Sequence, residues 1–455
     1  MYVHCFDKIL ERGGKMLKKK GFLLKTMVIV FAMCLLSPLG LIKSFADTQL
    51  PSDPNITAKY AITMDLKTGE VIYSKNANAK AYPASITKLL TALVFADHAQ
   101  KYDKIKFTQD AKSQPPYSLH SNWHGVTMKV GDTMTADDVM KGLLMFSGND
   151  AAYMIADSVA GNAQNFAQLM NKKAQEIGMK NSHFVTPNGL HNVDHYSTAY
   201  DLALLTKAAF ANPWVKEVMG CKDATISIGG KTVNLTNRNK TLGKNGNIAG
   251  KTGTTDQAGE CLAAVYNRDG RDIIGIVLNS AVSADDSTRY ADMDKIMDYS
   301  FAATPSVYKA AGSEVKNVNL KYKMFRFFGP EKTIEAPVTL SENAMLYKNS
   351  FNEKNAEISL NSNNDNAWSV ASDDNLTLTL SVKEYTQSLK GSVGISTFTL
   401  IKANIFAYLG ILLGIVIIVL LIIFIIRLIN QRRYNKRRYR SSYSYGKSYK
   451  KRFRR

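Results

Sequence analysis

The sequence is poor in cysteine. Its 455 residues contain four, Cys5, Cys34, Cys221 and Cys261. A small domain stapled by disulfides needs several closely spaced pairs, so a disulfide scaffold is excluded. Removal of the N-terminal leader predicted below leaves Cys221 and Cys261, and sequence alone does not bring their thiols within bonding distance. The sequence therefore leaves open whether Cys221 and Cys261 form one disulfide bridge.

Acidic residues are missing from the C-terminal end. Residues 427–455 hold thirteen Lys/Arg and no Asp or Glu, and residues 1–46 hold eight Lys/Arg against two acidic residues. These ends carry +13 and +6 of the formal charge of +20, which leaves +1 for residues 47–426. Nucleic-acid binding needs a basic face on the folded body, so we expect no nucleic-acid partner.

Histidine is also scarce, with seven in the chain and none in an H-E-x-x-H pattern. His183, His191, Asp194 and His195 cluster within thirteen residues, but Pro187-Asn188-Gly189 marks the stretch as a loop. Structural hydrogen bonding is favoured there over metal binding. The sequence therefore predicts no metal and no cofactor.

An apolar run follows the first basic segment. Residues 15–25 read KMLKKKGFLLK, an uncharged run follows, and the small-residue site Ser44-Phe45-Ala46 ends it. This order predicts a secretory signal peptide over residues 1–46, cleaved after Ala46. An uncleaved anchor is disfavoured because Pro38 and Gly40 interrupt the apolar run early.

A longer uncharged run precedes the basic C-terminal end. Residues 405–426 form 22 consecutive positions without a charge, and a helix of that length spans about 33 Å, enough to cross a bilayer. We predict a transmembrane helix over 405–426 and, by the positive-inside rule, a basic cytoplasmic tail over 427–455. Such a tail should contact anionic membrane lipids. Residues 47–404 then lie outside the cytoplasm of a single-pass membrane protein.

Strand and helix patterns over residues 47–305 follow the order β, α, β. A hairpin is predicted over 60–75, with Lys67-Thr68-Gly69 as its turn. Helical periodicity begins near Ser85, and further helices are expected from 151 to about 159 and through 197–210. A second hairpin turns at 267–270, and its apolar run Ile273–Leu278 is typical of a central strand. The order favours an α+β fold, an antiparallel sheet with helices packed on it.

Short alternating runs characterise residues 310–398. Leu376, Leu378, Leu380 and Val382 alternate with polar residues, which predicts a small all-β domain, assigned as a β-sandwich. It contains no catalytic constellation, and a spacer between membrane and enzyme is its favoured role.

Ser85 and Lys88 lie three residues apart at the expected helix start, so their side chains share a face. A serine hydroxyl becomes a nucleophile when a base takes its proton. A lysine can act as that base once burial and a neighbouring cation lower its pKa. S-x-x-K alone is a weak signal on any helix.

Two further motifs strengthen the S-x-x-K signal. Ser147-Gly148-Asn149 precedes the second helix, and Lys251-Thr252-Gly253 precedes the central hairpin. S-x-x-K, S-x-N and K-T-G, in this order and about 60 and 100 residues apart, occur in penicillin-binding proteins and class A β-lactamases. The chain resembles the serine D-alanyl-D-alanine carboxypeptidases, the low-molecular-mass penicillin-binding proteins, over residues 47–305. That resemblance implies a penicillin-binding/β-lactamase-like catalytic domain on a bacterial cell membrane. The family usually ends in an amphipathic membrane-surface helix, so the full span here departs from it.

The resemblance also implies roles. Ser85 would form an acyl-enzyme with the penultimate D-alanine of a peptidoglycan pentapeptide stem, or with a β-lactam antibiotic. Lys88 would accept its proton, and Ser147 would relay a proton to the leaving amine. The backbone N–H groups of Ser85 and Thr254 would form the oxyanion hole. Arg289 is either a further cation for the substrate carboxylate or a solvated residue at a helix start. The implied substrate-binding residues are Asn149, Lys251, Thr252, Gly253 and Thr254.

Three alternatives remain. A class A β-lactamase needs a deacylating glutamate before K-T-G, and neither Glu176 nor Glu217 has an E-x-x-x-N context. A transpeptidase would use the same motifs. A silent wall-binding protein would have no reason to keep all three. Lys67-Thr68-Gly69 comes before S-x-x-K, so only the second K-T-G fits the family order.

Overall fold

The computed structural model describes residues 52–360, 366–371 and 376–450. The predicted signal peptide over residues 1–46, with Cys5 and Cys34, lies outside the described residues. The division of the chain into domains stays a prediction.

A five-stranded antiparallel sheet forms the centre of the first region, with strand order β2-β1-β9-β8-β7. Both predicted hairpins are present, since β1 pairs with β2 and β8 pairs with β9. Strand β9 lies between β1 and β8, as expected for the run Ile273–Leu278. The strands are β1 (Tyr60–Asp65), β2 (Val71–Lys75), β7 (Asn247–Thr255), β8 (Gly259–Arg268) and β9 (Arg271–Ser280).

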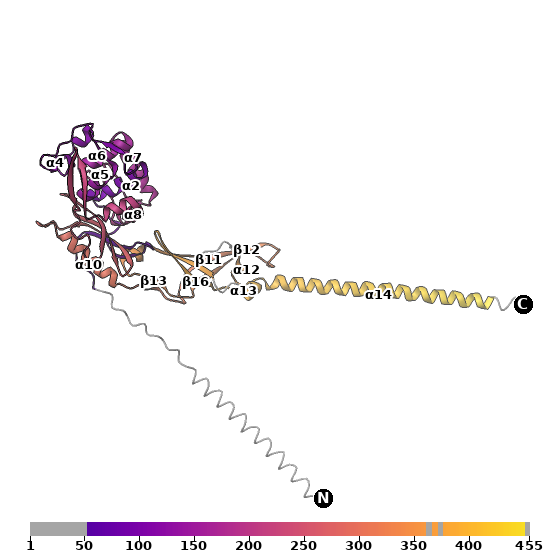
Figure 1. The fold of residues 1–455 in the computed structure, drawn as a ribbon. Helices are drawn as coiled ribbons and strands as arrows, with labels where there is room; N and C mark the ends of the chain where they lie inside the picture. Colours follow the sequence, from indigo (N-terminus) through magenta and orange to yellow (C-terminus); the bar gives the residue numbers. More distant parts are fainter. Residues whose placement is uncertain (1–51, 361–365, 372–375, 451–455) are drawn as a thin grey trace, which may run out of the picture. The chain divides into compact units, whose positions relative to one another are not determined.

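Each face of this sheet packs against helices. Along β8, Ala263 and Val265 belong to the core beneath the helical block. Leu262 and Tyr266 point the other way, into the core beneath α10 (Thr288–Ala302). This alternation follows from the two-residue period of a strand. Figure 1 shows the helical block on one side of the sheet and α10 on the other, so the predicted α+β fold is confirmed.

The helical block lies between β2 and β7 in the sequence, with two small antiparallel strand pairs inserted in it. Its helices are η1 (Ala84–Thr87), α2 (Lys88–His98), α3 (Gln109–Lys112), α4 (Leu119–Asn122), α5 (Ala136–Lys141), η2 (Gly142–Phe146), α6 (Asn149–Ala160), α7 (Ala163–Glu176), α8 (Ala199–Ala211) and α9 (Pro213–Met219). Its strand pairs are β3 (Lys104–Lys106) with β4 (Thr133–Thr135), and β5 (Asp223–Ile228) with β6 (Lys231–Thr236).

The all-β region that follows contains a second five-stranded sheet, in the order β11-β12-β16-β15-β14, and the pair β10-β13. The predicted alternation along β15 is confirmed, since Leu376, Leu378, Leu380 and Val382 are all buried. The elements are β10 (Ser306–Lys309), β11 (Glu314–Lys323), β12 (Glu331–Leu340), β13 (Ala344–Leu346), α11 (Ser350–Asn355), β14 (Ala356–Leu360), α12 (Ala367–Val370), β15 (Leu376–Val382), β16 (Tyr385–Val393) and α13 (Thr397–Lys402).

The last element is α14 (Ile405–Lys450). Its N-terminal part is long and apolar enough to cross a membrane, by length and composition. The helix continues well past Ile426, through basic residues for which the sequence analysis specified no structure. Lysine and arginine are good helix formers, which accounts for this continuation.

Candidate active site

Ser85 lies in η1, directly before α2. The preceding residue, Ala84, has a positive φ of 47°, a backbone conformation that side chains disfavour. Gly189 packs closely against this backbone, since a Cβ on Gly189 would overlap the carbonyl oxygen of Ala84. Strained backbone of this kind is common where a functional side chain must be presented in one direction.

Lys88 begins α2 and is fully buried. Its Nζ lies 2.9 Å from Ser85 Oγ, 3.1 Å from Asn149 Oδ1 and 2.8 Å from the carbonyl of Asn188. The amide oxygen and the carbonyl can only accept hydrogen bonds, whereas the serine hydroxyl can also donate. A neutral amine has two N–H groups and one lone pair, so it satisfies both acceptors and leaves its lone pair facing the serine proton.

The electrostatics favour that neutral form. Burial, with the nearby Arg238 guanidinium as a smaller contributor, lowers the pKa of Lys88 from 10.5 to about 7, and Asp150 opposes the shift. A base with a pKa near neutrality combines a substantial neutral fraction with useful basicity.

Ser147 and Lys251 form a second serine–lysine pair. Ser147 ends the π-helical turn η2 in the left-handed conformation, with φ 74°. Its Oγ lies 2.9 Å from Lys251 Nζ, which also donates to the carbonyl of Thr252. Burial is the largest cause that holds the pKa of Lys251 well below its usual value, followed by the cations Lys88, Arg238 and Arg289.

Asn149 links Lys88 to the segment that precedes α4. It is the first residue of α6 and is 5% exposed. Its Oδ1 accepts from Lys88, and its Nδ2 donates to the carbonyl of Pro116. These two bonds fix which end of the amide faces Lys88.

Strand β7 carries Lys251, Thr252, Gly253 and Thr254 along the edge of the sheet. It passes so close to η1 that a Cβ on Gly253 would lie 3.0 Å from both the carbonyl of Pro83 and the backbone nitrogen of Ser85. A side chain at the third position of K-T-G would therefore crowd η1 beside Ser85. The structure thus brings all three predicted motifs together around Ser85.

Comparison with known proteins identifies the family of the chain. The family model described as "D-alanyl-D-alanine carboxypeptidase", Peptidase S11, matches residues 47–282. The chain belongs to this family.

Two individual relatives are also D-alanyl-D-alanine carboxypeptidases. The chain is 30% identical to the carboxypeptidase DacF of Bacillus subtilis over 70% of its own length and 80% of that protein. It is 34% identical to DacC of Escherichia coli, of which it covers 64%.

Solved structures of similar fold include a carboxypeptidase and a transpeptidase. A Mycobacterium tuberculosis D-alanyl-D-alanine carboxypeptidase is 27% identical, with a TM-score of 0.53 over 57% of this chain and 96% of that one. A variant of a Streptomyces DD-transpeptidase is 30% identical, with a TM-score of 0.51 over 55% of this chain and 100% of that one.

Arg289 has a different environment from the solvated helix start that the sequence left open. It is 1% exposed, and its guanidinium donates to the carbonyls of Gly253 and Cys261 and to Thr254 Oγ1, at 2.7, 2.9 and 2.7 Å. The carboxylate of Glu260 lies 3.5 Å from Nε. The interpretation of Arg289 as a solvated residue was wrong, because its buried guanidinium holds the K-T-G strand and Thr254 through these hydrogen bonds.

Arg238 was not anticipated at all. It follows β6, its side chain is exposed, and its guanidinium lies 4.7 Å from the ring centre of Tyr117. From there it contributes to the lowered pKa of both site lysines. No local pattern marks this residue, since its role depends on a contact more than a hundred positions away.

The histidine cluster supports the fold of the site. His195 Nδ1 accepts from the backbone N–H groups of Val185 and Thr186, so Nε2 carries the proton and donates to Thr87 Oγ1 at 2.9 Å. Burial, with His183 and His191 as smaller causes, lowers its pKa to about 4. His195 is therefore a neutral support for the residue before Lys88.

The remaining sequence questions have simple answers. Cys221 and Cys261 are both free, so the disulfide left open is not formed. Lys67-Thr68-Gly69 is the β1–β2 turn, in which Asp65 Oδ1 accepts from the backbone N–H groups of Lys67 and Thr68.

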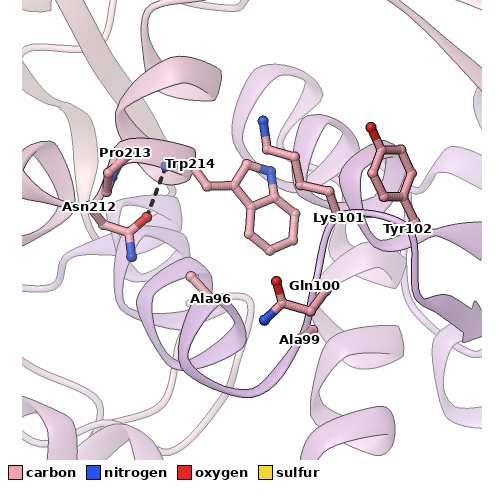
Figure 2. A pocket seen from close by; sticks show the side chains of 8 residues that line it. All are labelled: Ala96, Ala99, Gln100, Lys101, Tyr102, Asn212, Pro213 and Trp214. Carbon is pink, nitrogen blue, oxygen red and sulfur yellow. Dashed lines mark hydrogen bonds between the residues drawn. The ribbon is translucent and has the colours of Figure 1, made fainter.

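A separate cavity of about 430 Å³ lies at the other end of α2 (Figure 2). The eleven residues of α2 separate it from Ser85 by about 16 Å. The cavity is therefore not part of the serine–lysine site. It is lined by Ala96, Ala99, Gln100, Lys101, Tyr102, Asn212, Pro213 and Trp214.

Proposed function

We propose that Ser85 is the nucleophile and Lys88 the general base of a membrane-anchored D-alanyl-D-alanine carboxypeptidase. The observation that carries this is the set of contacts around Lys88 Nζ: two partners that only accept and one serine hydroxyl that can donate. A neutral amine in that set accepts the serine proton as the Oγ–carbon bond forms.

The reaction follows in two stages. Ser85 Oγ attacks the carbonyl carbon of the penultimate D-alanine of a pentapeptide stem, and its proton passes to Lys88. The C–N bond breaks, the terminal D-alanine leaves as an amine protonated through Ser147, and an acyl-enzyme remains. Water then attacks the ester, yields the tetrapeptide and restores the serine. A β-lactam reacts by the same first stage and stays attached as the acyl group.

Strand β7 suits the terminal carboxylate of such a substrate. Thr252 is partly exposed and Thr254 is exposed, while Lys251 and Arg289 lie buried behind them. Fixed cations and hydroxyls around an anion act without reorganisation during the reaction. We assign Lys251, Thr252 and Thr254 to carboxylate binding, with Arg289 positioning Thr254.

The activity test is release of D-alanine from a pentapeptide that ends in D-Ala-D-Ala, using the full chain in detergent or lipid. Ser85→Ala should abolish release, and Ser74→Ala, on the opposite edge strand β2, should not. Release that persists in Ser85→Ala contradicts the assignment.

Transfer to an amine is the second candidate, because a solved structure of similar fold is a DD-transpeptidase. Excess acceptor amine in the same assay separates the two. We expect mainly tetrapeptide and free D-alanine; a predominance of cross-linked dimer would make the chain a transpeptidase with the same nucleophile.

Anchoring is assigned to the apolar part of α14. The proposal places residues 47–404 outside the cytoplasm and the basic residues after Ile426 in the cytoplasm, where they lie against anionic lipids. Protease added to intact cells should digest the catalytic region and spare an epitope at Arg455. Loss of that epitope without permeabilisation would reverse the topology.

A further inference from the structure

The turn between β11 and β12 exposes aromatic rings. It reads Met324-Phe325-Arg326-Phe327-Phe328-Gly329-Pro330, and we refer to Met324–Pro330 as the aromatic turn. Phe327 is 79% exposed and Phe328 61%. Outside α14, the only other exposed phenylalanine among the described residues is Phe398, on α13, and residues 52–305 have none. Large apolar side chains gathered in water at one place mark a contact surface.

The aromatic turn has a defined conformation. Two backbone hydrogen bonds close the turn. The N–H of Met324 donates to the carbonyl of Pro330 at 3.2 Å, and the N–H of Phe325 donates to the carbonyl of Phe328 at 3.1 Å. The rings of Phe325 and Phe328 stack with centres 5.1 Å apart. Phe327 and Phe328 are therefore exposed although the turn itself has a defined conformation.

Contacts fix the aromatic turn beside the first residues of α14. Tyr408 donates from its hydroxyl to the carbonyl of Met324 at 3.3 Å, and its ring lies edge-on to Phe325 with centres 5.2 Å apart. Just before α14, Asn404 accepts from Lys332 at 2.7 Å and donates to the hydroxyl of Tyr322. The depth at which α14 enters a bilayer therefore also sets the depth of the aromatic turn.

One cation contacts these rings, and further basic residues lie close to them in the sequence. Arg326 lies 5.5 Å from the ring centre of Phe327, and Lys323, Lys332 and Lys402 are close in sequence to the turn or to α14. The acidic Glu331 lies near Lys321, 3.7 Å away. Aromatic rings bordered by basic side chains match the boundary between phospholipid headgroups and acyl chains.

We propose that the aromatic turn is a second membrane contact, which inserts Phe327 and Phe328 among the outer headgroups of the bilayer that α14 crosses. The inference rests on the proposed anchoring. Together the helix and the turn hold the adjacent sheet at two points, so they restrict how far the all-β region can tilt about α14.

The test places a reporter in the turn. The full-length Phe327→Trp chain is reconstituted into vesicles that contain phosphatidylglycerol, with bromine on the lipid chains near the headgroup. The emission of the unsubstituted chain, which has three tryptophans, is subtracted. Tyr102→Trp is the matched control, because Tyr102 is an exposed aromatic residue, 86% exposed, on the catalytic region.

We expect bromolipid to quench Phe327→Trp several-fold more than Tyr102→Trp. Adding Phe328→Asp to Phe327→Trp should reduce the quenching, because a carboxylate opposes insertion. Neither change should alter penicillin labelling of Ser85.

Flotation of the vesicles separates the possible failures. Chains that float but show equal quenching at both positions overturn the membrane contact and leave the anchoring intact. Chains that do not float overturn both. Emission from Phe327→Trp that depends on the protein-to-lipid ratio and not on bromolipid would assign the turn to a second copy of the chain, and also overturns the proposal.

Discussion

The same tripeptide, Lys-Thr-Gly, lies in two different environments of this molecule. The turn copy, Lys67-Thr68-Gly69, connects β1 and β2, and the side chain of Lys67 is exposed. The strand copy, Lys251-Thr252-Gly253, lies in β7, and Lys251 is 1% exposed. The glycines differ as well: Gly69 is required by a φ of +79°, Gly253 by the close approach of η1.

The difference shows that the chemistry comes from the surroundings of the motif. Burial, followed by three further cations, lowers the pKa of Lys251, whereas the side chain of Lys67 is exposed. The strand copy also has a serine hydroxyl within hydrogen-bond distance. The predictions below separate these contributions, beginning with the largest expected effect.

Lys88→Ala should have the largest effect, because it removes the proposed general base from the buried network around the strand copy. Loss of the general base should slow penicillin acylation by about 10²–10⁴-fold. The rate is measured by stopped-flow or gel labelling at saturating penicillin. Lys112→Ala, an exposed lysine on α3, serves as the control. A change of less than threefold in Lys88→Ala would assign the proton transfer to another group.

Arg289→Met tests the support beneath the strand copy. It removes one partner of a buried ion pair and leaves Glu260 without its cation, which should cost about 3–5 kcal/mol of unfolding free energy. Arg271→Met is the matched control near the turn copy. Its ion pair with Asp65 is partly exposed, so the expected cost is about 1 kcal/mol or less. Urea titration of both variants measures the difference, and equal costs would contradict the role given to Arg289.

The pH dependence of acylation tests the neutral state of Lys88. Its pKa is lowered to about 7, and only the uncharged amine can accept the serine proton. The acylation rate should therefore fall about tenfold per pH unit below about 7 and level off above it. In the Lys88→Ala variant this inflection should disappear. A rate that rises as the pH falls would mean that the charged amine is the active form.

Replacing the glycine of each copy by alanine should affect stability in the turn copy and activity in the strand copy. Both effects should be smaller than those above. Gly69→Ala introduces a side chain at positive φ, at a cost of about 1–2 kcal/mol in stability, with no change in acylation. Gly253→Ala should lower the acylation rate, because its Cβ displaces the backbone of η1 next to Ser85. Thermal melting and penicillin labelling are measured on both. Slower acylation in Gly69→Ala alone would reverse the comparison.

Sequence reasoning found the motifs because their spacing reflects local geometry. Ser85 and Lys88 face one another through helical periodicity, and the order of the three motifs selected the K-T-G that the fold brings beside Ser147. Arg238 and the burial of Arg289 were not predictable in this way. Their effects depend on contacts with Tyr117 and with the carbonyls of β7 and β8, which only the folded chain brings near.

The central claim is that only the strand copy takes part in catalysis. Its most direct test compares the acylation rate of labelled penicillin in Lys67→Ala and Lys251→Ala, prepared as full-length chains under the same conditions. The account predicts an unchanged rate for Lys67→Ala and a loss of about 10²–10³-fold for Lys251→Ala, the range for removing one preorganised electrostatic group. Equal rates in the two variants, or a larger loss in Lys67→Ala, would contradict it.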